Sequence, residues 1–233
     1  MKEEKVAVVT AAGRGIGAAI ARELAARGFR VALMSTSNAV EVARELGGVG
    51  MQGSVTRSED LDALVELAMR SYGRIDAVVN NTGHPPKGDL LALDDASWQA
   101  GLDMLLLNVI RTMRKVTPIM QRQGGGAVVN ISSYAAAMPE QSMPVSSVFR
   151  AALSSFTRLY AERHAVDGIR MNSVLPGFVD SWPETPEVVA RIPMQRFGTT
   201  QEIAQTVVFL LSDASGYITG QNLRVDGGIV KSV

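Results

Sequence analysis

The chain has 233 residues, of which 46% are hydrophobic and 20% charged, so it can bury a substantial core without disulfides or structural metals. Lysine plus arginine and aspartate plus glutamate both number 23, which disfavours nucleic acids and anionic membranes as partners. The absence of cysteine excludes disulfides, thiolate catalysis and thiolate metal sites.

Two further features concern metals and location. The chain has only two histidines, His84 and His164, and no paired-histidine motif, so we expect no metal site. The first residues, Met1 to Lys5, are mostly charged and lead into a short apolar run. We therefore expect neither a signal peptide nor a membrane span, and a cytoplasmic protein.

Short β-branched runs alternate with amphipathic stretches along the chain. The expected strands are Val6 to Val9, Arg30 to Met34, Ala77 to Val79, Ala127 to Ile131, Arg170 to Val174 and Asn222 to Val225. The clearest helical patterns are Ile16 to Ala26, Leu61 to Tyr72 and Ala204 to Ser212. This alternation predicts an α/β fold with a parallel sheet covered by helices on both faces. No linker or repeat interrupts it, so we expect a single domain over residues 1–233.

One segment lacks any regular pattern. The region from Asp180 to Met194 contains three prolines and follows an expected strand. We expect it to form a short substrate lid. Trp182 within it either lines the substrate site or packs in the core.

A glycine-rich turn follows the first expected strand and opens the first expected helix. It reads Thr10-Ala11-Ala12-Gly13-Arg14-Gly15-Ile16-Gly17. Glycines let the backbone approach a pyrophosphate, and the helix N-terminus supplies N–H donors and a partial positive charge. We expect a dinucleotide here, although a glycine-rich turn without a ligand is the alternative. The residues expected to hold it are Thr10, Gly13, Arg14, Gly15, Ile16 and Gly17.

The same turn resembles the T-G-x-x-x-G-x-G loop of the short-chain dehydrogenase/reductase family, with Ala11 in place of the first glycine. Further matching motifs are Asn80-Asn81-Thr82-Gly83, Asn108, Pro176-Gly177 and Asp226-Gly227-Gly228. The resemblance implies a single-domain, doubly wound Rossmann fold with about seven strands, assembled as a homotetramer or homodimer. It implies a place for Asn108 in the active site. It also implies cofactor contacts from Asn80, Thr82, Gly83, Pro176, Gly177, Val179 and Ser181.

The preferred dinucleotide depends on the charge at the end of the second strand. A carboxylate there would bind the ribose 2′-hydroxyl of NAD and repel the 2′-phosphate of NADP. This chain has Ser35-Thr36-Ser37 instead, and Arg14 can pair with a phosphate. We therefore expect NADP(H) rather than NAD(H); the alternative is that Arg14 is solvated and the hydroxyls are caps. By the family resemblance, Ser54 and Val55 lie beside the adenine.

Members of this family place a serine after the fifth strand, a tyrosine thirteen positions later and a lysine four beyond that. Ser133 supplies the serine, and the same spacing falls on Ser146 and Arg150. An aliphatic hydroxyl is a far weaker acid than a phenol, whereas Arg150 keeps a permanent charge that can still reach the nicotinamide ribose. We therefore expect the chain to reduce simple ketones poorly or not at all.

Two residues are candidate replacements for the missing proton donor. His84 follows the Asn80 to Gly83 motif, and its unperturbed pKa of about 6.5 suits proton transfer. An exposed loop histidine is the alternative. Tyr134 adjoins Ser133 and keeps a phenol, although neighbours at a strand end often point to opposite sides.

Three functions remain open. The first is an atypical NADP(H)-dependent oxidoreductase acting on a small organic substrate with a C=N or conjugated C=C bond, since these need little proton transfer from the protein. The second is elimination, cyclisation or isomerisation in the same pocket without net redox change. The third is a catalytically silent nucleotide-binding subunit, paired in a mixed oligomer with an active relative.

Overall fold

Seven parallel strands form one sheet in the order β3-β2-β1-β4-β5-β6-β7. This computed structural model describes residues 4–232, so residues 1–3 and 233 of the predicted domain lie outside the described part. The strands are β1 Val6–Thr10, β2 Arg30–Ser35, β3 Val49–Gln52, β4 Ala77–Asn80, β5 Gly126–Ile131, β6 Ile169–Pro176 and β7 Asn222–Val225. The parallel sheet and the six strands expected from the sequence are confirmed, with small shifts at their ends.

The strand that the sequence did not indicate, β3, lies at the edge of the sheet. Its pattern is weak because its residues are partly exposed and because glycine stands where a branched residue would be expected. A Cβ at Gly50 would lie 2.6 Å from the carbonyl oxygen of Ala39, at the start of a helix. The close approach of that helix therefore requires Gly50, the same residue that weakens the strand pattern in the sequence.

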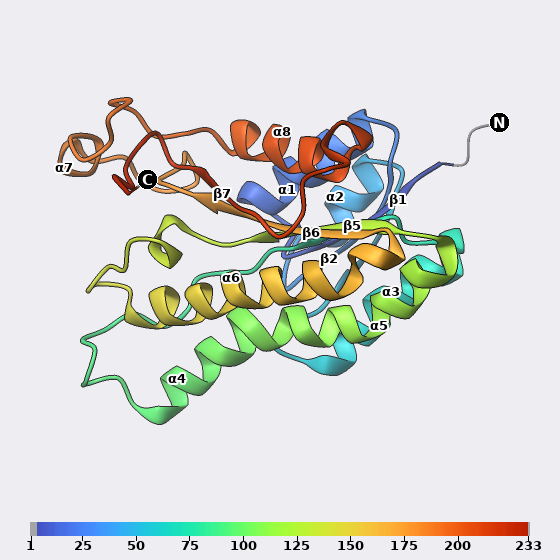
Figure 1. Ribbon diagram of the computed structural model, residues 1–233, viewed down its shortest axis with the longest axis horizontal. Coiled ribbons are helices and arrows are strands. Elements are labelled where there is room, and N and C mark those ends of the chain that lie inside the picture. Colours follow the sequence, from blue (N-terminus) through green and yellow to red (C-terminus); the bar gives the residue numbers. More distant parts are fainter. Residues whose placement is uncertain (1–3, 233) are drawn as a thin grey trace.

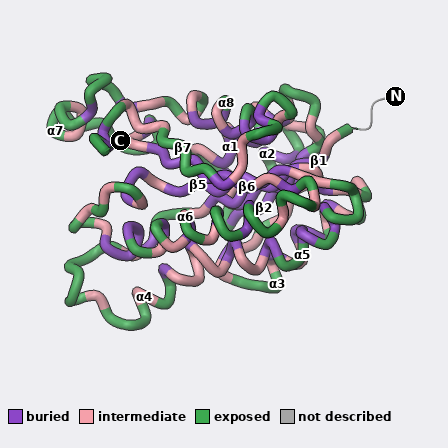
Figure 2. Tube along the Cα trace, in the orientation of Figure 1, coloured by how far each residue is buried: buried purple, intermediate pink, exposed green. Residues whose placement is uncertain are grey.

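Helices cover both faces of the sheet (Figure 1). One face carries α1 Gly15–Ala26, α2 Ala39–Glu45 and α8 Thr200–Leu211. The other carries α3 Ser58–Tyr72, α4 Asp95–Leu102, α5 Asn108–Gln123 and α6 Pro144–His164. Along β1, Ala7 and Val9 pack on the α1 side and Val8 on the other, as strand alternation requires. Figure 2 shows the resulting buried sheet between exposed outer helix faces.

Helix α8 begins four residues before its predicted start. A capping box causes this: the Thr199 side chain accepts from the Glu202 backbone N–H at 3.1 Å, and the Glu202 carboxylate accepts from the Thr199 N–H at 2.7 Å. Among residues 4–232, none of the helices has both the length and the hydropathy needed to cross a bilayer.

The loops at the carboxyl ends of the strands gather at one end of the molecule, on the left in Figure 1. The segment predicted as a lid, residues 180–194, lies there and contains one short helix, α7 Pro186–Val189. The remaining short turns are a π-helical turn, η1 Asp103–Leu107, and three 3-10 turns, η2 Tyr134–Ala136, η3 Ala165–Asp167 and η4 Asp213–Ser215. Because parallel strands present their carboxyl ends at one edge, this is where a ligand site is expected.

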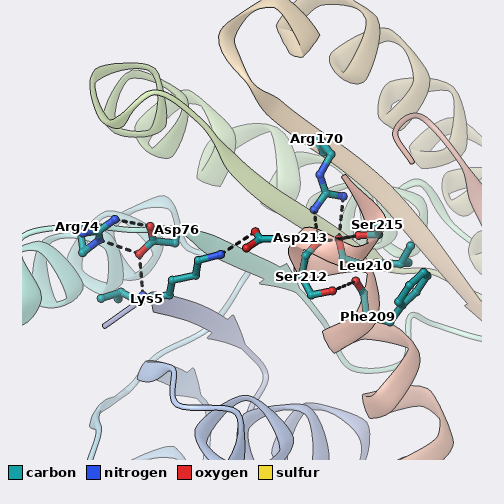
Figure 3. Close-up of polar contacts among 10 residues, drawn as sticks. Lys5, Arg74, Asp76, Arg170, Phe209, Leu210, Ser212, Asp213 and Ser215 are labelled. Atoms are coloured by element: carbon teal, nitrogen blue, oxygen red, sulfur yellow. Dashed lines mark hydrogen bonds and ion pairs between the residues drawn. The ribbon is translucent and has the colours of Figure 1, made fainter. Parts of the chain in front are cut away.

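At the opposite end of the sheet, Arg170 of β6 holds the C-terminus of α8 (Figure 3). Its Nη1 donates to the carbonyl oxygens of Leu210 at 2.9 Å and Ile218 at 3.2 Å, and its Nη2 donates to that of Ser212 at 3.1 Å. Carbonyls at the end of a helix have no partner within the helix, so this guanidinium and the Ser215 hydroxyl together supply donors to Leu210 and Ser212.

We expect Arg170→Met to lower the free energy of unfolding by about 2–4 kcal/mol, because three carbonyl groups lose a charged donor. Urea unfolding followed by circular dichroism measures the change. Arg122→Met, at the exposed end of α5, is the control and should alter stability by less than about 0.5 kcal/mol. Equal losses in the two variants would contradict a capping role for Arg170.

Candidate active site

A cavity of about 660 Å³ opens at the carboxyl edge of the sheet. Its walls come from the turns after β1, β2, β3, β4, β5 and β6 and from the start of α6. The size is typical of a small-molecule or cofactor site. The predicted site residues that line it are Gly13, Arg14, Gly15, Ile16, Ser35, Thr36, Ser37, Ser54, Val55, Thr82, Gly83, His84, Ser133, Tyr134, Ser146, Arg150, Pro176, Gly177, Val179 and Ser181.

Four predicted site residues lie behind the lining rather than in it: Thr10, Gly17, Asn80 and Asn108. The Thr10 hydroxyl donates to the carbonyl of Asn81 at 2.7 Å and accepts from its N–H at 2.9 Å. The Asn80 amide donates to the Asn130 side chain at 2.8 Å. These contacts hold the ends of β1, β4 and β5 in register, so they set the shape of the cavity floor.

The turn between β1 and α1 is tightly packed. A Cβ at Gly13 would overlap the carbonyl oxygen of Ser37, and a Cβ at Gly17 would overlap that of Ala11. Ala11 itself has a φ of 47°, in the left-handed region that glycine adopts without strain. The backbone conformation thus keeps the form of a glycine loop, although the first glycine is absent.

We expect Ala11→Gly to raise the free energy of unfolding by about 0.5–1 kcal/mol. A left-handed alanine costs about 1–2 kcal/mol, and part of this gain is lost because glycine has more conformational entropy in the unfolded chain. Thermal and urea unfolding measure the effect. Ala12→Gly is the control: this buried alanine has no positive φ, so its replacement should destabilise the chain. A destabilised Ala11→Gly variant would contradict the claim that the backbone at Ala11 is strained.

The turn after β2 offers hydroxyl groups to this end of the cavity. Thr36 and Ser37 are exposed there, while the Ser35 hydroxyl is turned inward and donates to the Ser37 carbonyl. Ser54 binds Thr56 through its hydroxyl at 2.8 Å. Among residues 4–232, the cavity lining contains no aspartate or glutamate. Nothing in the lining would therefore repel a phosphate.

Two residues of the lining carry buried hydroxyl groups without a partner. The side-chain oxygens of Thr82 and Ser132 have no hydrogen-bond partner among the described residues. Buried polar groups are almost always paired, so these two are exceptions beside the cavity. The amide oxygen of Asn108, behind the lining, is unpaired as well.

At the other end of the cavity, helix α6 presents Ser146 and Arg150 beside Ser133. Arg150 Nε donates to Ser146 Oγ at 3.1 Å, and Nη1 donates to the carbonyl of Ile131 at 2.8 Å. Burial lowers the pKa of Arg150 to about 10. No carboxylate among the described residues pairs with it. The cavity floor therefore holds a desolvated cation without a counter-ion.

Both candidate proton donors line the cavity, and their surroundings shift their pKa values in opposite directions. Burial, followed by the neighbouring Glu140, raises the pKa of Tyr134 to about 12, and the phenol donates to Glu140 at 3.1 Å. Burial, followed by the charges of Arg150, Lys87 and Arg14, lowers the pKa of His84. The phenol is thus a weaker acid than free tyrosine, and the histidine is mostly neutral at pH 7.

A contact between two loops, absent from the sequence prediction, crosses the mouth of the cavity. The rings of His84 and Trp182 pack edge to face with centroids 4.5 Å apart, and the Lys87 ammonium lies 4.5 Å from the Trp182 ring centre. Trp182, for which lining and core packing were both open, lines the cavity and is 38% exposed. Lys87 was missed because nothing local marks it; only the fold brings it to Trp182.

Comparison with known proteins identifies the family. Residues 10–230 match the sequence model of a family described as Enoyl-(Acyl carrier protein) reductase. A 3-oxoacyl-[acyl-carrier-protein] reductase of Escherichia coli (strain K12) is 34% identical over 97% of this chain and 98% of its own. The chain belongs to the short-chain dehydrogenase/reductase family. A Synechocystis enzyme of the same description is 35% identical over 97% of both chains.

Solved structures of similar proteins agree with this family and fold. An L-sorbose reductase from Gluconobacter frateurii, complexed with NADPH and L-sorbose, has a TM-score of 0.92 and 31% identity, over 99% of this chain and 98% of that one. YwfH, an NADPH-dependent reductase involved in bacilysin biosynthesis, has a TM-score of 0.93 at 23% identity, a likeness of fold alone, over 99% and 100% of the two chains. The short-chain dehydrogenase/reductase family predicted from the motifs is therefore confirmed.

Proposed function

We propose that this short-chain dehydrogenase/reductase is an NADP(H)-dependent reductase of conjugated C=C bonds in small organic substrates. The observation that carries the proposal is Arg150, a buried cation without a counter-ion, placed beside Ser133 and Ser146 in a cavity that lacks an efficient proton donor.

The cofactor part of the proposal rests on the dinucleotide end of the cavity. Gly13 and Gly17 let the turn after β1 pack against the carbonyl oxygens of Ser37 and Ala11, which keeps the form of a dinucleotide loop. Arg14 with the exposed hydroxyls of Thr36 and Ser37 would hold a 2′-phosphate. The lining offers no carboxylate to bind the 2′-hydroxyl of NAD. The 31% identical L-sorbose reductase, whose structure contains NADPH, supports the same choice. When bound, the reduced cofactor supplies the hydride.

The reaction part rests on charge. Hydride addition to the β-carbon of a conjugated ketone moves an electron pair from the C=C bond toward the carbonyl oxygen, which becomes an enolate oxygen. Arg150, whose site is desolvated, would stabilise that negative charge more strongly than a solvated cation can, and the Ser133 hydroxyl would donate to the same oxygen. Protonation at the α-carbon can then follow from water. This route does not need the acid that Ser146 cannot provide.

The charge of Arg150 also favours one of the two substrate types that the sequence left open, conjugated C=C bonds, over C=N bonds. An iminium is already positive, so an unpaired guanidinium in the cavity floor opposes its binding. A neutral enone has no such penalty, and its reduced form gains from the cation. The family description, an enoyl reductase, also supports C=C over C=N chemistry.

The proposal is tested by binding first and turnover second. Fluorescence titration should give a Kd for NADPH at least tenfold below that for NADH. Arg14→Ala should raise the Kd for NADPH and leave the Kd for NADH unchanged. NADPH oxidation should then follow addition of a conjugated ketone but not of its saturated ketone or of a cyclic imine.

Other outcomes would contradict the proposal. Product formation without loss of NADPH absorbance would indicate elimination or isomerisation. Intact NADPH binding with no product from enone, ketone or imine would indicate a silent nucleotide-binding subunit.

A further inference from the structure

The residues His84, Lys87 and Trp182, here called the arch, join two loops that leave the sheet on opposite sides of β5. His84 and Lys87 follow β4, and Trp182 follows β6; β5 lies between these strands. The two contacts of 4.5 Å, from His84 and from Lys87 to Trp182, therefore join the loop after β4 to the loop after β6. Ser133 follows β5 and lines the same cavity as the three arch residues.

The cavity is positively charged in a chain whose overall charge is balanced. Its lining contains Arg14, Lys87 and Arg150 and, among residues 4–232, no acidic side chain. Three acidic residues of adjacent loops have partners outside the cavity lining. Asp89 accepts from the backbone N–H of Leu91, Asp180 accepts from that of Thr200, and Glu140 pairs with Arg191.

The three cations occupy different parts of the cavity. Arg14 lies in the β1 turn, near the hydroxyls proposed to bind the 2′-phosphate, and Arg150 lies in the floor beside Ser146. Lys87 lies on the arch, against the ring of Trp182. The ring face of Trp182 holds its ammonium without consuming a hydrogen-bond donor, and no carboxylate within the described part of the chain forms an ion pair with it. Lys87 therefore has donors to offer to an anion at the rim.

We propose that Lys87 is a specificity residue that binds a carboxylate of the substrate, so that the enzyme selects conjugated substrates bearing an acid group. This rests on the proposed reductase function and names its substrate class. His84, mostly neutral at pH 7, supplies a second donor to the same carboxylate without adding charge.

The test uses a matched pair of probes, 3-benzoylacrylate and its primary amide, which share a conjugated ketone and differ in charge. Isothermal titration calorimetry measures both Kd values, with and without saturating NADP⁺, which cannot reduce either probe. The native chain should bind the acid at least tenfold more tightly than the amide. Lys87→Gln should reduce this ratio to threefold or less. Lys115→Gln removes a lysine that pairs with Asp62 on the outer side of α5, and should keep the native ratio.

Two results would overturn the proposal. One is an acid-to-amide ratio that Lys87→Gln leaves unchanged. The other is a Kd for NADPH raised tenfold or more by Lys87→Gln, which would mean that Lys87 binds a cofactor phosphate instead. Because binding of the probes is measured without turnover, the two proposals can fail separately. Preferential binding of the acid without any NADPH oxidation would contradict only the proposed reductase function. Reduction of both probes without preference would contradict only the specificity proposal.

Discussion

Arg150→Met should lower kcat for a conjugated ketone by about 100- to 1000-fold, the range found when one preorganised donor to a developing oxyanion is removed. Methionine keeps much of the side-chain volume but neither the charge nor the N–H groups. Stopped-flow or steady-state measurement of NADPH oxidation gives the effect. A fall in kcat rather than a rise in KM alone would place Arg150 in transition-state stabilisation.

The same substitution should change the stability of the fold little, because two effects oppose each other. Folding lowers the pKa of Arg150 from 12.5 to about 10, so the charged form is disfavoured in the folded state at every pH below about 10, pH 7 included. Removing the charge therefore stabilises the fold, whereas losing the hydrogen bonds to Ser146 and Ile131 destabilises it. We expect the free energy of unfolding to change by less than about 2 kcal/mol.

The control for Arg150→Met is Arg158→Met, an exposed arginine on the same helix that does not line the cavity. It should leave both kcat and stability within about twofold and 0.5 kcal/mol of the native values. An Arg150→Met chain with native turnover would contradict the electrostatic mechanism. A chain that loses activity only because it unfolds would show as a lowered melting temperature.

Ser146→Tyr combined with Arg150→Lys should create ketone reductase activity, raising turnover of a 3-keto ester by about 100- to 10,000-fold over the native chain. That is the usual contribution of a positioned general acid. Positions 146 and 150 share one face of α6 and both line the cavity with Ser133, so a phenol and an ammonium placed there face the same space. NADPH oxidation with the ketone measures the gain.

The matched control is Ser146→Phe with Arg150→Lys, which adds the same ring without the hydroxyl. It should show no gain, because the acid is absent. Equal activity in the two double variants would contradict proton donation as the missing function. A Tyr and Lys variant that binds NADPH but stays inactive would show that the substrate pocket, and not the missing acid, excludes ketones.

Local sequence patterns fixed much of the fold. The strands β1, β2, β4 and β5 could be predicted because buried parallel strands are short, largely apolar runs bounded by turns. The edge strand β3 could not, since the packing of α2 demands Gly50 where a branched residue would have marked a strand. Ala11 occupies the position of the first glycine in the family loop, and the structure gives it the left-handed φ that glycine adopts without strain.

The family motifs, the glycine loop and the pairing of Ser146 with Arg150 could all be read from the chain, since helix spacing alone puts residues four apart on one face. The electrostatics of the cavity, in contrast, depend on how the chain packs. Desolvation of Arg150, the absence of acidic residues from the described lining and the meeting of Lys87 with Trp182 depend on atoms from distant parts of the chain. Burial and long-range charge are properties of the packed molecule, which no local pattern encodes.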